Sequence, residues 1–265
     1  MTLELDQSDA RAGKGQDAGD QSGSTPVGHL VINFFNVVII LPLVWVLLMS
    51  VKSLPDAMQG NFWPKRFDFT HYAYVFQRIA TLPVNLFNSV YVTAATVLIT
   101  TAIAVLAGYA LVHIRPRGAG VVLAMLFVSL YFPVRVVSLI SILVMRSMFQ
   151  LVPHEIIESA KIDGAGHLRT LWEVGLPMVR NGLVVIFIVN FVAAWGEYLL
   201  GVTLIDDEAK RTMPVVLAAA QGGQGQWAWP NLAAVYVIVV TPGIIAFTFA
   251  QKLFFKGLLE GALKG

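Results

Sequence analysis

Long runs of apolar residues constrain the fold of this chain more than any other feature. The first run, LVINFFNVVIILPLVWVLLMSV at 30–51, is about as long as the roughly 20 residues that a helix needs to cross the hydrocarbon core of a bilayer. Four more runs of this kind follow at 85–113, 119–145, 182–205 and 232–255. We therefore expect an all-α integral membrane protein, with some of its helices bent at prolines, namely Pro42, Pro133 and Pro242.

The composition excludes several classes of function. Hydrophobic residues make up 57% of the chain and charged residues only 13%, which leaves no room for a soluble catalytic domain. Without cysteine there can be no disulfide, thiolate metal site or cysteine nucleophile, and the five histidines show no metal-ligand spacing. The phosphate-binding motif G-x-x-x-x-G-K-[ST] is also absent. We expect a protein that is not an enzyme and binds no cofactor or metal, and a net charge of +2 gives no reason to expect a nucleic-acid partner.

The first 28 residues are rich in Asp, Gly, Gln and Ser and lack the apolar run of a signal peptide, so they predict a flexible tail. Residues 29–265 then form the membrane domain. Basic residues concentrate on the cytoplasmic side of membrane proteins, which places the tail, the loop with Arg115 and Arg117, and the chain's end inside. We expect a multi-pass protein of the bacterial cytoplasmic (inner) membrane with both termini in the cytoplasm.

The number of membrane crossings is one too few for this topology. The Arg115 loop and a polar segment at 153–177 should share one side, which needs an even number of crossings, yet the run 119–145 is long enough for only one. A return pass would need roughly 25 to 35 further residues near SLISILVMRSMF. Either a segment is absent between about Ser138 and Met148, or this stretch is a re-entrant pair. We favour absence, which predicts a spatial break there or helix ends on opposite membrane faces.

The polar segment includes ESAKIDGAGHLRTLWEVGLP at 158–177 and predicts a helical hairpin. Pro153 suits the first turn of a short helix with Ile156 and Ala160 on one face, and the residues at 163–166 break it. A second helix then has three apolar residues at helical spacing, Leu168, Leu171 and Trp172. Two short amphipathic helices around a glycine turn suit a groove of a partner protein or, equally, the lipid headgroups.

The hairpin resembles a known signature. Its residues Glu158, Ser159, Ala160, Gly164, Val174, Leu176 and Pro177 match the pattern "EAA, three residues, G, nine residues, I, one residue, LP" of permease subunits of binding-protein-dependent ATP-binding-cassette (ABC) importers, with Ser and Val replacing the usual Ala and Ile. The segments NSVYVTAATVLIT, GYALVHIRPRG and FVAAWGEYLLG are similar to other parts of that family, with Gly196 at a frequent Asn position. The ending FFKGLLEGALKG resembles carbohydrate permeases of the maltose-transport MalG type.

This resemblance implies a type I ABC importer permease fold with six transmembrane helices, of which about five are clear in this sequence. It implies that the hairpin couples transport to a cytoplasmic ATPase through five residues, Glu158, Ser159, Ala160, Asp163 and Gly164. The implied partners are a second, homologous permease subunit, two ATPase subunits that use ATP and Mg, and an extracytoplasmic solute-binding protein. The implied substrate is a carbohydrate, either a sugar or a sugar-like solute.

Polar residues inside the apolar run 182–205, the fifth helix of the expected six, are candidates for the translocation path. Asn190 and Glu197 are seven residues apart, about two helical turns, which predicts one shared face with Trp195 near its outer end. Alternatively, both residues hydrogen-bond to the partner permease. In the next outer loop, Trp227 and Trp229 belong to an interfacial aromatic belt or contact the binding protein or a sugar ring.

Two further interpretations concern structure. Ala104 and Gly108 are four residues apart and predict close helix packing, and Arg135 is expected to extend toward the headgroups. Two rival functions stay open: a secondary transporter that uses Glu197 as a proton or ion site, and an ABC permease for amino acids, ions or phosphate.

Overall fold

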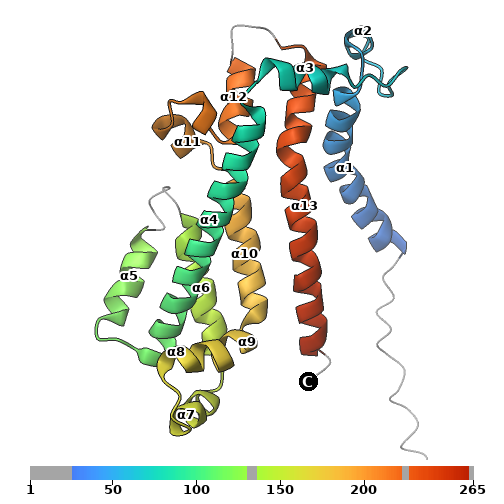
Figure 1. The fold of residues 1–265 in the computed structure, drawn as a ribbon. Coiled ribbons are helices and arrows are strands. Elements are labelled where there is room, and N and C mark those ends of the chain that lie inside the picture. Colours follow the sequence, from blue (N-terminus) through green and yellow to red (C-terminus); the bar gives the residue numbers. More distant parts are fainter. Residues whose placement is uncertain (1–25, 130–135, 223–226, 263–265) are drawn as a thin grey trace, which may run out of the picture. The chain divides into compact units, whose positions relative to one another are not determined.

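The computed structural model describes residues 26–129, 136–222 and 227–262, and nearly all of their regular structure is helical (Figure 1). The only β-structure in these ranges is a single bridge between Lys52 and Phe67. The chain divides into two units, residues 1–45 and 46–265. The first unit contains most of α1 (Pro26–Ser50), which includes the first apolar run, and most of the expected tail lies outside the described residues.

Three helices are long and apolar enough to span a bilayer alone, at Gly28–Ser50, Leu82–Ile114 and Trp229–Phe249. They correspond to α1, to α4 (Leu82–Tyr109) with its π-helical continuation η1 (Ala110–Ile114), and to α13 (Trp229–Ala262). Two bent pairs, 139–162 and 167–195, would raise the number of spans in the described chain to five. The all-helical membrane fold is therefore confirmed. Pro42 and Pro242 lie inside α1 and α13 without ending either helix, and Pro133 lies outside the described residues.

The second unit has two ends, which the short helices mark (Figure 1). One, called here the α3 end, has α2 (Leu54–Met58), α3 (Thr70–Arg78) and α12 (Met213–Gly222), with α11 (Leu199–Leu204) and the 3-10 turn η3 (Glu208–Lys210) next to them. The other, the hairpin end, has α7 (His154–Ile162), α8 (His167–Thr170), the π-helical turn η2 (Leu171–Gly175) and α9 (Leu176–Met178). The helix α10 (Arg180–Trp195) runs beside α4 between them.

Each end of this unit has its own hydrophobic core. The hairpin-end core joins α4, α6 (Val136–Gln150), α7, η2 and α10, and its buried residues include Tyr109, Phe149, Ile157, Leu171 and Ile186. The α3-end core joins α3, α4, α12 and α13, and its buried residues include Val75, Leu82, Met213, Val216 and Val235. Because α4 contributes to both cores, it links the two ends mechanically.

Helices α4 and α6 touch at Gly108. A Cβ atom built on Gly108 would lie 2.9 Å from the Cβ of Met145 and 3.0 Å from the backbone nitrogen of Arg146. Ala104, one turn earlier, is fully buried. The predicted close packing at Ala104 and Gly108 is therefore confirmed, and only glycine allows the two backbones to approach this closely.

The segment between the Arg115 loop and the hairpin differs from the prediction. It contains α5 (Ala119–Ser129, 11 residues) and α6 (15 residues), which extend only about 16 and 22 Å at 1.5 Å per residue, short of the roughly 30 Å of a hydrocarbon core. Helix α6 is continuous through Ser138 and Met148, so the predicted break in that stretch is wrong.

The pair α5–α6 also starts and finishes at the same end of the unit. Arg115, just before α5, has its Nη2 atom 3.3 Å from Nε2 of His154, which begins α7 after α6. The rings of His113 and His154 are 5.4 Å apart, centre to centre. The described helices therefore form a short pair, as the re-entrant alternative required, and not two ends on opposite faces. Arg135 lies outside the described residues.

Candidate coupling hairpin and translocation site

The hairpin has the predicted turn between two helical segments. Pro153 precedes the first helical residue instead of lying within the first turn, and α7 ends at Ile162, with Asp163 directly after it. Gly164 follows with φ of +81°, a left-handed conformation that strains any residue with a Cβ. A Cβ at Gly164 would meet nothing within 4 Å, so the need for glycine there comes from the backbone and not from crowding.

One side of the hairpin is anchored in the hairpin-end core. Ile157 and Leu171 are each 1% exposed and belong to the same buried cluster as Tyr109 of α4 and Phe149 of α6. Within α7, Ile157 is the residue that packs inward, while its neighbour Ile156 is exposed. This anchoring attaches the hairpin firmly to α4, α6 and α10.

The other side of the hairpin is uncovered. Leu168 and Trp172, two of the three apolar residues at helical spacing, are 67% and 68% exposed, whereas the third, Leu171, is buried. Of the five predicted coupling residues, four are exposed and Ala160 is half-buried. The surface thus combines large apolar side chains with charged ones such as Glu158, a combination that suits both a groove of a partner protein and the lipid headgroups.

Asn190 lies at a helix–helix contact inside this chain. It is 3% exposed, and its Oδ1 accepts a hydrogen bond of 3.0 Å from the hydroxyl of Ser141 on α6. Its Nδ2 is buried and has no hydrogen-bond partner among the described residues. Asn190 therefore ties α10 to α6, a role that the sequence did not indicate.

Glu197 lies beyond the end of α10, in a break that the sequence did not predict. The helix stops at Trp195, and α11 begins at Leu199, so Asn190 and Glu197 do not share a continuous helical face. Glu197 Oε1 accepts a hydrogen bond of 2.7 Å from the backbone nitrogen of Leu200 in the first turn of α11. Trp195 donates from Nε1 to the carbonyl of Val239 on α13, at 3.1 Å.

Trp195 and Glu197 together line a cavity of about 220 Å³, called here the Glu197 cavity. Its other polar lining comes from Ser89, Thr93 and Thr212. Sequence reasoning missed the α4 residues, although Asn85, Ser89 and Thr93 recur every four residues within an apolar run and are all buried. That spacing places them on one helical face and was the available signal.

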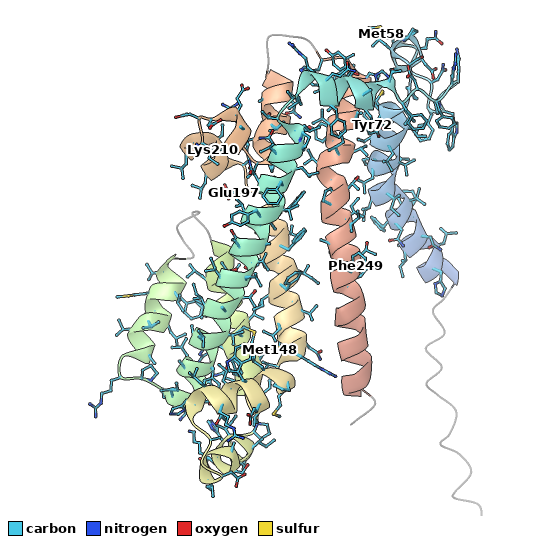
Figure 2. All side chains as sticks on the ribbon, in the orientation of Figure 1. Met58, Tyr72, Met148, Glu197, Lys210 and Phe249 are labelled. Atoms are coloured by element: carbon cyan, nitrogen blue, oxygen red, sulfur yellow. The ribbon has the colours of Figure 1, made fainter. Side chains whose placement is uncertain are left out.

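The polar face of α4 also fixes the loop that follows α11. Asn85 donates from Nδ2 to the carbonyls of Glu208 and Arg211, at 2.7 and 2.9 Å. The hydroxyl of Ser89 accepts from the backbone nitrogen of Met213, at 2.7 Å. Figure 2 shows Glu197 and Lys210 near α11, while Met148 lies toward the hairpin end.

A second, larger cavity of about 390 Å³ lies at the α3 end, called here the α3-end pocket. Arg78, Thr81, Glu208, Arg211 and Trp227 are among its lining residues. Of the two tryptophans predicted to contact solute or binding protein, Trp227 lines this pocket, whereas Trp229 is 68% exposed and does not.

Cysteine labelling should distinguish Glu197 from Asn190. In a chain without native cysteine, Glu197→Cys in the assembled transporter should react with a small polar thiol reagent, because the position lines a cavity. Asn190→Cys should stay protected, because the position is 3% exposed between α10 and α6. Labelling is measured by mass spectrometry with and without ATP. Equal reaction of both variants would place Asn190 on an aqueous path, as the sequence alone suggested.

Solved and curated proteins resemble this chain over most of its length. It is 25% identical to the diacetylchitobiose uptake system permease protein NgcG of Streptomyces coelicolor, covering 90% of this chain and 88% of that protein. It is 27% identical to the trehalose/maltose transport system permease protein MalG of Thermococcus litoralis, covering 86% and 93%. The fold matches a chain of a bacterial ABC transporter that imports the acidic polysaccharide alginate, with a TM-score of 0.75 at 22% identity, over 86% of this chain and 95% of that one.

The alignments also show that this chain is internally shorter than its relatives. The alignment with NgcG spans 268 positions, yet 90% of 265 residues is only about 239, so about 29 positions have no residue of this chain. The alignment with MalG spans 260 positions against about 228 residues, 86% of the chain, which leaves about 32. A shortage of this size agrees with the roughly 25 to 35 residues of the absent return pass.

The family assignment follows from the match over nearly the whole chain. Residues 19–260 match the family described as "Binding-protein-dependent transport system inner membrane component". The match includes the described spans, the hairpin and both cavities. The chain therefore belongs to this family of inner membrane components of ABC importers, as a multi-pass permease without an ATPase domain of its own.

Proposed function

We propose that this chain forms half of the translocation path of an ATP-driven importer for a carbohydrate or sugar-like solute. The observation that carries the proposal is the hairpin, in which Glu158, Ser159, Asp163 and Gly164 are exposed while Ile157 and Leu171 anchor it in the core. The carbohydrate class is supported by the relatives, which are named for diacetylchitobiose, trehalose and maltose, and sulfoquinovosyl glycerol.

The proposed assembly contains a second homologous permease, two ATPase subunits that use ATP and Mg, and an extracytoplasmic binding protein. The hairpin end faces the cytoplasm, because Arg115, Arg117, Lys161 and Arg169 lie there and basic residues concentrate on that side. Both termini are then cytoplasmic, and the α3 end faces outward.

The hairpin-end core explains how ATPase closure would reach the membrane helices. A partner that grips the exposed side of the hairpin moves Ile157 and Leu171, and these pack in one cluster with Tyr109 on α4 and Ile186 on α10. Protein cores are close-packed, so a displacement of the hairpin is transmitted to α4 and α10 as a body movement. The same two helices line the Glu197 cavity, which can thereby open to alternate sides.

A solute panel on the complete transporter tests this function. The complex is purified, reconstituted in liposomes with its binding protein, and assayed for ATPase stimulation and uptake with sugars, amino acids and phosphate. We expect stimulation only by a carbohydrate or sugar derivative. Stimulation by an amino acid or phosphate would contradict the substrate class, and uptake that continues without ATP would support a secondary transporter that uses Glu197.

A further inference from the structure

The α3-end pocket has the size of a ligand site and an unusual set of charges. Its volume of about 390 Å³ falls in the range typical of small-molecule sites. Its charged lining residues are two arginines, Arg78 and Arg211, and one carboxylate, Glu208. The formal charge of the lining is therefore positive, within a protein that has few charged residues.

Neither arginine is fully neutralised. Arg78, exposed at the end of α3, has no ion-pair or hydrogen-bond partner in the described part of the chain. Arg211 has its Nη1 atom 3.7 Å from Glu208 Oε1 and donates from Nη2 to the carbonyl of Asp206. Its Nε is buried without a hydrogen-bond partner among the described residues. Guanidinium groups with free donors are suited to bind a carboxylate, phosphate or sulfonate.

An aromatic ring borders the same pocket. Trp227 packs edge-to-face against Tyr74 of α3, with ring centres 5.8 Å apart, which restrains the indole. A restrained indole supplies a flat apolar surface with little loss of side-chain entropy, and the apolar face of a sugar ring can lie on it.

The loop that holds the acidic and basic residues is fixed before any ligand arrives. Asn85 binds the carbonyls of both Glu208 and Arg211, and Asn88 donates to the carbonyl of Ala209 at 2.8 Å. Asp207 accepts from the nitrogen of Ala209, and this hydrogen bond lowers the pKa of its carboxyl group. A preformed site loses less entropy on binding than a flexible loop would.

From this arrangement we infer that the α3-end pocket binds an acidic saccharide, with its anionic group on Arg78 and Arg211 and its ring against Trp227. The inference rests on the proposed carbohydrate function and narrows its substrate class. The pocket lies at the end of α4 away from the hairpin. Thr81, which lines the pocket, directly precedes α4, and the helix continues from there to Ser89 and Thr93 in the Glu197 cavity. The pocket is therefore the first binding site that the solute meets on the outer side.

Saturation-transfer NMR on the complete transporter tests the inference. The complex is placed in phosphatidylcholine nanodiscs without binding protein, so neither an acidic lipid nor a protein carboxylate supplies the anion. D-Glucuronate, the matched neutral sugar D-glucose, and acetate are added in turn. We expect transfer to the ring protons of glucuronate at least about tenfold stronger than to those of glucose, because a charge-assisted contact is lost with glucose. Acetate should compete only weakly.

Two variants and a matched control locate the binding. Arg78→Gln should reduce the glucuronate signal about tenfold, and this side chain has no other described contact whose loss could disturb the fold. Trp227→Leu should reduce it similarly. Lys210→Gln removes one nearby positive charge that pairs with Asp207 outside the pocket, and should leave the signal unchanged. Basal ATPase activity and gel-filtration profile verify assembly of each variant.

The outcomes separate this inference from the proposed function. Equal signals for glucuronate and glucose, or a glucuronate signal that survives Arg78→Gln, would overturn the pocket assignment. Competition by acetate as strong as by glucuronate itself would overturn its saccharide part. If neutral sugars still stimulate the ATPase in any of these cases, the carbohydrate importer stands and only the pocket assignment fails. If no sugar stimulates it, the proposed function fails.

Discussion

Glu158→Arg and Gly164→Val should each reduce solute uptake strongly while the permease still inserts into the membrane. Glu158 is exposed on the uncovered side of the hairpin, so reversing its charge disturbs an ATPase contact and not the core. At Gly164 a β-branched residue meets open space but must adopt φ of +81°, which costs about 1 to 2 kcal/mol and reshapes the turn. We expect uptake and solute-stimulated ATPase activity to fall at least about tenfold, since coupling needs the seated hairpin.

Two matched controls separate docking from general damage. Glu155→Arg reverses an exposed carboxylate on the same helix, outside the signature residues, and Gly60→Val introduces the same kind of strain at φ of +71° at the α3 end. Both controls should keep uptake near the wild-type level. If Glu158→Arg and Gly164→Val transport as well as these controls do, the hairpin is not the coupling element.

The hairpin shows which part of a structure a sequence can predict. Its polar composition, its two prolines and its glycine turn indicated two short helices, and the structure has them. The sequence did not indicate which of the apolar residues Leu168, Leu171 and Trp172 packs inward, and only Leu171 is buried. An apolar side chain is expected to be buried, but the sequence does not show whether it is buried in the chain's own core or against another protein.

The polar residues within the apolar runs were also difficult to interpret from the sequence. Asn190 and Glu197 stood out because ionisable and amide groups are costly there, yet Asn190 binds Ser141 within the chain. The spacing of seven residues assumed one straight helix, and Gly196 ends it. The polar face of α4 was overlooked because single Asn, Ser and Thr residues are inconspicuous in a long apolar run. Whether the Glu197 cavity carries solute stays a prediction.

The shortage of residues was predicted in size but not in position. Helices α5 and α6 and their connection span only residues 119–150, whereas two full passes and a turn need more than 40 residues. The relatives have about 29 to 32 more positions within the aligned region. The sequence did not reveal the two short helices, because the apolar run 119–145 is about as long as one ordinary membrane pass.

Gly108→Ala should destabilise the permease more than any other single methyl addition to a described helix glycine. The new Cβ would lie 2.9 Å from Met145 Cβ and 3.0 Å from backbone atoms of Met145 and Arg146, so α4 and α6 must separate. Overpacking of this kind costs about 1 to 3 kcal/mol. Gly108→Leu should prevent recovery of folded protein, since its side chain has no space in the interface.

A graded series makes this prediction specific. Gly182→Ala places its Cβ 2.5 Å from Cγ of Met148, whose flexible side chain can move, so the loss should be smaller than at Gly108. Gly120→Ala on α5 meets nothing within 4 Å and should be neutral or slightly stabilising, because alanine favours the helix. Apparent Tm of the purified complex, followed by gel filtration after heating, should fall in the order Gly120→Ala, Gly182→Ala, Gly108→Ala. Equal Tm values for Gly108→Ala and Gly120→Ala would show that α4 and α6 do not pack this closely.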